Sequence, residues 1–363
     1  MKKLIALLLT LTLMLPLATL AENGPTGSPP EGQPHDRIFG TLSMLNMTEE
    51  EYLTLISARG MIGERLRDTE PPEDLPDNPP KSAPDGPASE NKIIYYDTLN
   101  ALLMALNAGD INNIEIYQSV ARYLCATNDN LRIGPSFDVD KASDTFADLA
   151  QKNFNGNDFA FMMMESNAAL RDEFNAAIAA MKADGTLERL VKEQIDDLID
   201  GDEINPIALP KIDGAETVKV AVTGALPPMD YVAEDGTPAG FNTAMLAEIG
   251  NRIGKNIEIV VVDSLGRAAA LASGTVDAVF WTRTSSEAQE AVTRTEAERQ
   301  TRRAELDANM TEEEIALMNE LAECMNPSAY GTADMPEDTI VTEPYFSDVL
   351  VPVMLAREAP QSK

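Results

Sequence analysis

The feature of this sequence that most constrains the fold is an alternation of two patterns between Thr217 and Trp281. Apolar runs rich in β-branched residues at 218–222, 257–262 and 276–281 predict three buried strands. Between them, apolar positions recur at spacings of three and four, which predicts two helices. This strand–helix–strand–helix–strand order is typical of an open parallel sheet with helices on both faces, so we expect an α/β fold.

The loops after these strands contain the first candidate binding residues, because an open parallel sheet binds ligands at the carboxyl ends of its strands. After the first strand, Gly224 and Pro227-Pro228 predict a rigid, extended loop. Asn242 is expected to cap the helix that follows. The candidate ligand-binding residues at these strand ends are Asp230, Tyr231, Trp281, Thr282, Arg283 and Thr284.

Four short motifs along this region resemble those of the family 3 extracellular solute-binding proteins, the receptor components of amino-acid-type ABC importers. The resemblance implies a two-lobe, type 2 periplasmic-binding-protein-like fold that closes on a small solute and presents it to a membrane permease. The motifs are Pro227-Pro228, Asp235-Gly236 followed by Gly240-Phe241, Leu271-Ala-Ser-Gly-Thr-Val-Asp277, and Thr342-Glu-Pro-Tyr-Phe346.

The order of the family's segments is unusual in this chain. Segments 159–164 and 167–190 resemble the strand and helix that end such proteins, yet here they precede the family's beginning. Further upstream, 93–97, 99–109 and 111–117 resemble the strand, helix and strand of the second lobe. The resemblance therefore implies a circular permutation, with two unrelated partial domains as the alternative.

This permuted order implies a division of the chain into consecutive segments. The insertion in the first lobe has helical composition, and Thr311 with Glu314 predicts a capping box for its second helix. It is either a surface hairpin or a docking element for a partner. The expected segments are a second lobe at 36–160 with a Pro-rich loop at 69–90, the closing strand end and helix of the first lobe at 161–200, a connector at 201–216, and a first lobe at 217–356 with an inserted helical hairpin at 285–335.

The beginning of the chain has the pattern of a secretory signal. Lys2-Lys3 precedes an apolar run, and Ala21 provides a small residue for cleavage, so 1–21 is the expected signal peptide and 22–35 a flexible tail. An uncleaved membrane anchor is the alternative. No Cys lies near the cleavage point, so no lipid anchor is expected, and we expect the protein in the periplasm or outside the cell.

The charge balance and the histidine and cysteine content exclude several function classes. With 28 basic and 60 acidic residues, the net charge of −32 argues against a nucleic-acid partner. His35 is the sole histidine and lies in the tail, so His-dependent catalytic triads and His-rich metal sites are excluded. Cys125 and Cys324 form either one disulfide or two separate thiols. We expect a monomeric protein with no enzymatic activity, metal or cofactor.

The resemblance also assigns residues on the second lobe to the ligand cleft. Ser43, Asn46 and Thr48 lie where the family has an anion-binding loop, and Tyr117 with Gln118 replaces its ammonium-binding Asp. The family's Thr-x-x-Arg is missing after Thr284, and Arg283 is the substitute that can pair with a carboxylate. We expect these residues to line one cleft, together with Glu343 and Tyr345.

These observations predict an extracytoplasmic protein that captures a small, amino-acid-like solute for ABC-type import. Because the α-amino-acid clamp is incomplete, the ligand is an unusual amino acid, a peptide-like molecule or another polar solute, or transport has been lost. The alternative function is a non-transport sensor or protein-interaction module on the same fold.

Overall fold

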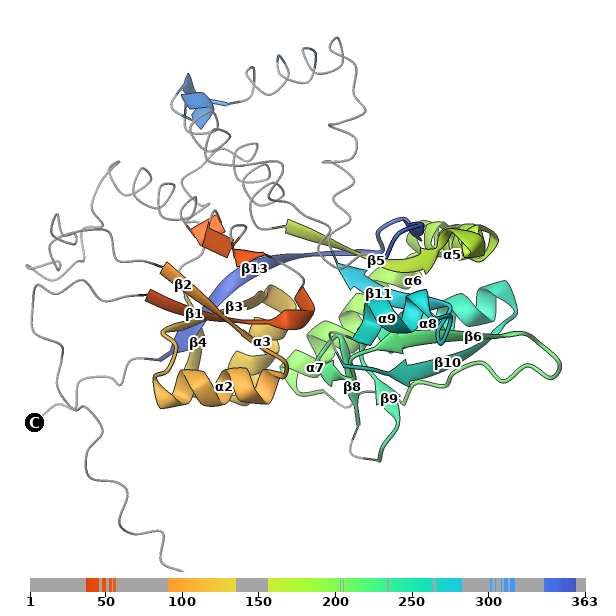
Figure 1. Cartoon of the computed structure of the whole chain (residues 1–363), viewed down its shortest axis with the longest axis horizontal. Coiled ribbons are helices and arrows are strands. Elements are labelled where there is room, and N and C mark those ends of the chain that lie inside the picture. Colours follow the sequence, from red (N-terminus) through yellow and green to blue (C-terminus); the bar gives the residue numbers. More distant parts are fainter. Residues whose placement is uncertain are drawn as a thin grey trace, which may run out of the picture. The chain divides into compact units, whose positions relative to one another are not determined.

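The fold is known from a computed structural model of the chain (Figure 1). The elements discussed below belong to the compact unit formed by residues 36–75 and 90–363. The structure describes residues 37–45, 48–49, 52–53, 55–56, 91–134, 156–202, 204, 206–233, 235–263, 266–282, 301, 304, 308, 310–312, 314–316 and 336–356.

The three strands predicted between Thr217 and Trp281 form a parallel sheet, which confirms the expected α/β class. Strand β6 (Thr217–Val222) lies between β10 (Asn256–Val261) and β11 (Ala278–Thr282). Helix α8 (Phe241–Ile253) connects β6 to β10, and α9 (Gly266–Ala272) connects β10 to β11. We call these five elements, together with the segment 225–239 and the helical segment 168–200 described below, the first lobe.

A second group of parallel strands forms from the amino-terminal part of the chain. Strand β1 (Arg37–Leu42) lies between β2 (Asn91–Tyr96) and β3 (Asn113–Tyr117). Helix α2 (Leu99–Ala108) connects β2 to β3, and α3 (Gln118–Thr127) follows β3. We call these elements, with the 3-10 turn η1 (Ser43–Leu45) after β1, the second lobe.

Two long antiparallel strands join the lobes into one sheet. Strand β5 (Gly156–Met164) pairs with β11, and β13 (Phe346–Leu355) pairs with β3. The two strands also pair with each other, from Gly156 opposite Val349 to Phe159 opposite Phe346. The strand order is therefore β10-β6-β11-β5-β13-β3-β1-β2, with β12 (Thr339–Val341) beside β5 and β4 (Leu131–Ile133) beside β13 (Figure 1). The segments 159–164 and 349–354 therefore belong to neighbouring strands.

The helical segment after β5 packs on the first lobe, as predicted. Helix α5 (Ala168–Ala183) contacts α8 and β12, and its buried face contains Phe174, Ile178 and Met181. The closing segment expected at 161–200 is not one continuous helix. Gly185 has a φ of 76° and separates α5 from α6 (Thr186–Val191), which continues into the π-helix η5 (Lys192–Asp196) and α7 (Asp197–Asp200).

The start of α8 differs from the expected Asn242 cap. Gly240 has a φ of 97°, and a Cβ there would lie 2.7 Å from the Met229 carbonyl oxygen. This close approach lets the backbone N–H groups of Phe241 and Asn242 donate to the carbonyls of Pro228 and Met229. Because these carbonyls accept bonds from the first N–H groups of α8, no side-chain cap is needed. Asn242 is buried and has another role described below.

The acidic-Gly turn of the first-lobe motif forms as expected. Strands β8 (Asp230–Val232) and β9 (Pro238–Ala239) pair as a hairpin around Gly236, whose φ is 84°, and β7 (Ala225–Leu226) pairs with β8. The Asp235 carboxylate accepts bonds from the backbone N–H and the hydroxyl of Thr237 within this turn. The hairpin places Asp230 and Tyr231 next to the end of β6.

Several predicted segments lie wholly or largely outside the described residues. These are the signal peptide at 1–21, the tail at 22–35, the loop at 69–90 and most of the insertion at 285–335. Within the insertion, the capping box is confirmed: the Thr311 N–H donates to Glu314 Oε2 at 2.8 Å, and the Glu314 N–H donates to Thr311 Oγ1 at 3.2 Å. None of the described helices is long and apolar enough to cross a membrane.

A buried hydroxyl connects β5 to the loop before β13. Thr342 Oγ1 accepts a bond from the Phe161 N–H at 3.0 Å, and the side chain is 3% exposed. We expect Thr342→Val to lower the free energy of unfolding by about 1–3 kcal/mol, because the Phe161 N–H would lose its buried acceptor. Urea denaturation measures this change.

The matched control is Thr127→Val in α3. The Thr127 hydroxyl donates to the Tyr123 carbonyl on an exposed face, so the same substitution should change stability by less than about 0.5 kcal/mol. Equal losses in both variants would contradict the role assigned to Thr342.

Candidate functional site

The carboxyl ends of strands from both lobes meet around one buried side chain, Arg267. This arginine is in the first turn of α9 and is 1% exposed. Its Nη1 donates to the Phe280 carbonyl at 2.9 Å, in the middle of β11, and its Nη2 donates to the Met44 carbonyl at 2.7 Å, just after β1. A single guanidinium therefore binds the two lobes together. We call Arg267, its two carbonyl acceptors, Asp230 and Tyr117 the junction site.

Burial of a guanidinium is costly unless other groups compensate its charge. Burial lowers the pKa of Arg267 to about 10, while Asp230 and Tyr117 oppose this shift by favouring the charged form. Arg267 therefore stays protonated at neutral pH. Asp230 lies on the first lobe and Tyr117 on the second, so the electrostatic partners of Arg267 also come from both lobes.

Asp230 is fully buried and held by the end of β6. Its Oδ2 accepts bonds from the N–H groups of Thr223 and Gly224, both at 3.0 Å, and from the Thr223 hydroxyl at 2.9 Å. Burial raises the pKa of Asp230 to about 6, against the effects of these bonds and of Arg267. The carboxylate is thus mostly ionised at neutral pH and supplies a negative charge to the junction site.

Tyr117 and Asp348 organise the second-lobe side. The Tyr117 ring lies 4.9 Å from that of Phe159, which in turn stacks on Phe280 at 5.2 Å. Asp348 on β13 accepts a bond from the Ser119 N–H at the start of α3, at 3.1 Å. Burial raises the pKa of Asp348 to about 6. A carboxylate from the connecting strand therefore stabilises the helix that follows Tyr117.

The structure brings several predicted site residues near the junction site. Asp230 and Tyr117 are part of it, and Tyr231 is half-buried and close enough to Tyr123 of α3 to interact electrostatically. Ser43 donates to the Tyr96 carbonyl and the Asp97 carboxylate, and Gln118 is exposed at the start of α3. Ser43 follows β1, Tyr117 ends β3 and Gln118 follows it, while Asp230 and Tyr231 begin the short strand β8.

Other predicted residues fall partly or wholly outside the described part of the chain. Asn46, Arg283 and Thr284 lie outside it. Trp281 and Thr282 are placed by their backbone only, as the last two residues of β11. Cys125 is a half-buried free thiol in α3, while Cys324 lies outside the described residues.

Glu343 and Tyr345 are held by groups other than the junction site. The Glu343 N–H donates to Asn175 Oδ1 on α5 at 2.7 Å. Tyr345 is 2% exposed, stacks on Phe161 with ring centroids 4.8 Å apart, and donates its hydroxyl to Asn242 Oδ1 at 2.8 Å. These contacts give Tyr345 a structural role between β5 and α8.

Arg267 is the functional candidate that the sequence analysis missed. In the segment Gly266-Arg-Ala-Ala-Ala-Leu271, Arg267 precedes the buried Leu271 by four residues. Residues four apart share a helix face, so this spacing places the arginine on the buried face of α9. The sequence signal that could have identified Arg267 was a cationic side chain on the apolar face of an alanine-rich helix.

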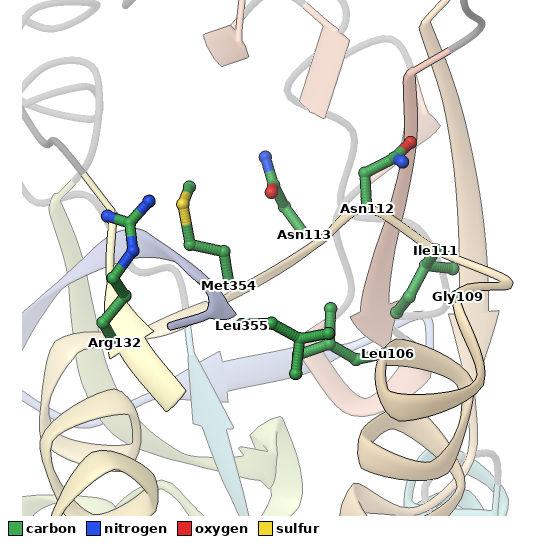
Figure 2. A pocket seen from close by; sticks show the side chains of 8 residues that line it. All are labelled: Leu106, Gly109, Ile111, Asn112, Asn113, Arg132, Met354 and Leu355. Carbon is green, nitrogen blue, oxygen red and sulfur yellow. The ribbon is translucent and has the colours of Figure 1, made fainter. Parts of the chain in front are cut away.

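The two best-defined cavities lie away from the junction site. One, of about 330 Å³, lies between α2, β4 and β13, where Leu106, Leu355 and Arg132 contribute to its wall (Figure 2). It also includes Asn113, the first residue of β3, and so lies at the opposite end of that strand from Tyr117. The other, of about 540 Å³, is lined by residues of α6, β5 and the 344–347 segment. Among the described residues, no acidic, Cys or His cluster has the arrangement of a metal site.

Comparison with known proteins identifies the class of the first lobe. Residues 218–304 match the family model "Bacterial extracellular solute-binding proteins, family 3", a segment that begins in β6 and includes α8, α9 and β11. The resemblance seen in the sequence is therefore confirmed over this segment, which is similar to these binding proteins. No curated protein sequence matches the chain.

Solved structures give weaker similarities. The ligand-binding component of an ABC-type import system from Staphylococcus aureus is 9% identical, with 88% of this chain and 66% of that chain covered and a TM-score of 0.34. The GluR0 ligand-binding core in complex with L-glutamate is 8% identical, with 91% and 88% covered and a TM-score of 0.32. A histidine kinase sensor domain with similarity to periplasmic binding proteins is 8% identical, with 89% and 84% covered and a TM-score of 0.32. All three TM-scores lie below 0.5. The strand pairing of this chain defines its architecture.

The buried hydroxyl of Tyr345 gives a direct test of its structural role. We expect Tyr345→Phe to lower the free energy of unfolding by about 1–3 kcal/mol, because Asn242 Oδ1 would lose its donor in a buried site. Tyr231→Phe, at a half-buried position, should cost less than about 0.5 kcal/mol. Chemical denaturation compares the two, and an unchanged Tyr345→Phe variant would contradict the assignment.

The raised pKa of Asp230 predicts a pH-dependent stability. The carboxyl titrates near 3.9 in an unfolded chain and at about 6 in the folded protein, so folding takes up a proton between these values. The contribution of Asp230 to the free energy of unfolding should therefore fall by roughly 2 kcal/mol as pH rises from 4 to 7. Asp230→Asn should remove this part of the slope, as measured by denaturation at several pH values.

Asp184→Asn is the control for this series. Hydrogen bonds from Thr186 and Arg252 lower the pKa of Asp184 to about 2, so its contribution to stability changes little between pH 4 and pH 7. Its removal should leave the slope between pH 4 and pH 7 as in the wild type. A wild-type slope in Asp230→Asn would show that other groups cause the pH dependence.

Proposed function

We propose that this protein is an extracytoplasmic binding protein that holds a small polar solute between its two lobes. The observation that supports this most strongly is the convergence of strand carboxyl ends from both lobes on the junction site. Such strand ends are the ligand-binding edge of open parallel sheets. The match of residues 218–304 to a family of extracellular solute-binding proteins supports the same function and an extracytoplasmic location.

The ligand that we propose is amino-acid-like and carries a carboxylate. Arg283 follows Trp281 and Thr282 at the carboxyl end of β11, where it can form a bidentate pair with that carboxylate. Tyr231 and Trp281 supply an apolar wall, and Thr282, Thr284, Ser43, Asn46 and Gln118 supply polar contacts. In this proposal the protein acts as a monomer and delivers its solute to an ABC permease.

We further propose that the two lobes are those of a periplasmic-binding-protein-like fold in circularly permuted order. The second lobe comes first at 36–160, the closing segment at 161–200 returns to the first lobe, and the first lobe follows at 217–356. The pairing of β5 with both β11 and β13 supports this proposal, because β5 then continues the sheet of both lobes. Chain breaks in exposed loops are tolerated, so permutation requires little change in packing.

A non-transport sensor or interaction module is the second candidate. The side chain of Arg267 itself joins Phe280 of the first lobe to Met44 of the second. A protein whose lobes are held together in this way fits a role without solute transport. In that role a partner protein binds the form in which the lobes are in contact. The insertion at 285–335 is then the proposed partner surface.

Ligand screening of the purified chain distinguishes the two candidates. A solute that binds only the folded protein raises its melting temperature, so amino acids, dipeptides and organic acids are screened by thermal shift. We expect a carboxylate-bearing solute to give the largest increase. The absence of any response across these classes would favour the non-transport function.

The identified solute then tests the role of Arg283. We expect Arg283→Ala to weaken its binding by at least about 2 kcal/mol, roughly 30-fold, because a buried carboxylate would lose its charged partner. Isothermal titration calorimetry measures the loss, with Arg252→Ala as the control because Arg252 pairs with Asp184 and Glu248 within the first lobe. Wild-type affinity in Arg283→Ala would exclude the carboxylate pairing.

A further inference from the structure

We propose that the junction site is a guanidinium-binding site that the chain fills with its own Arg267. The acceptors around this side chain have the features of a ligand site for an alkylguanidinium group. They are a carbonyl from each lobe, at Phe280 and Met44, and the buried carboxylate of Asp230 adds a negative charge that stabilises the cation from nearby. This inference concerns the junction site of the proposed function, but it does not depend on transport or on the identity of the solute.

The first argument is the origin of the two carbonyl acceptors. Phe280 belongs to β11 and Met44 to η1, so the guanidinium connects elements of different lobes. In proteins that close by hinge motion, a bound ligand stabilises the closed form by contacting both lobes. Arg267 makes such contacts from within the chain and therefore replaces the ligand in this role.

The second argument is the balance of charge. Asp230 accepts three hydrogen bonds from Thr223 and Gly224 through one oxygen, which fixes the carboxylate at the end of β6. A buried carboxylate held in this way needs a nearby cation, and Arg267 supplies it. Without Arg267 the site would keep a fixed negative charge and two carbonyl acceptors, a set suited to a planar cation with several N–H donors.

The third argument compares Arg267 with an exposed ion pair between α3 of the second lobe and η5 of the first. Arg122 of α3 pairs with Asp196 of η5 at 2.9 Å, but their side chains are 41% and 42% exposed. Exposed pairs contribute little because water solvates both partners when they separate. Arg267 is buried, so separation of the lobes is expected to depend on Arg267 far more than on Arg122.

Removal of the side chain tests the proposal. In Arg267→Ala, water must enter to solvate Asp230 and the two carbonyls, so we expect the lobes to separate and the radius of gyration from small-angle X-ray scattering to increase. Methylguanidinium should then occupy the vacated site, restore the wild-type radius and raise the melting temperature by about 2–4 °C or more. Methylurea, which has a similar shape but no charge, should have neither effect.

Two further variants complete the experiment. Arg122→Ala should keep the wild-type radius and not respond to methylguanidinium, because its ion pair is exposed. Arg267→Met keeps much of the side-chain volume without the donors, so it should show the larger radius but bind no methylguanidinium. If Arg267→Ala does not fold alone, methylguanidinium should restore its circular dichroism spectrum.

Two results would overturn the proposal. The first is a wild-type radius in both Arg267→Ala and Arg267→Met, which would show that Arg267 does not hold the lobes together. The second is an Arg267→Ala protein, folded or unfolded, that responds equally to methylguanidinium and methylurea or to neither. A solute found by screening the wild type would leave the proposed function standing in either case.

Discussion

The pairing of β5 with β13 is the constraint on which the rest of the structure depends. Each strand continues the sheet of one lobe, β5 beside β11 and β13 beside β3, and their shared ladder makes the two sheets continuous. Phe159 on β5 contacts both Tyr117 and Phe280, so aromatic packing follows the same path between the lobes. This pairing brings the strand ends of the two lobes close enough for Arg267 to contact both.

The junction site combines a buried cation and a buried anion that are fixed by different elements. Asp230 is held by backbone N–H groups after β6, and Arg267 by backbone carbonyls within β11 and just after β1. Burial lowers the pKa of Arg267 and raises that of Asp230, because it disfavours the charged form of each group. Each charge in turn stabilises the charged form of the other. The two charges favour the arrangement in which the lobes contact one another.

Much of the local structure was predictable because it depends on short-range patterns. The β-branched runs became β6, β10 and β11, and Gly109 ended α2 with a φ of 79°. The predictions failed where a distant segment provides the interaction. Asn242 does not cap α8 because the Pro228 and Met229 carbonyls accept the first N–H bonds of the helix, and its side chain instead accepts from Tyr345, about a hundred residues away.

The sequence by itself determined the α/β class, the two groups of strands and the resemblance to solute-binding proteins, because hydrophobic periodicity and turn residues act within a few residues. It also indicated strand-end positions for Asp230 and Tyr117. Only the tertiary structure decided that Arg267 joins these positions, because its two acceptors are backbone carbonyls, which every residue has and no sequence pattern marks. Their convergence depends on the β5–β13 pairing, which brings Met44 and Phe280 together from positions more than two hundred residues apart.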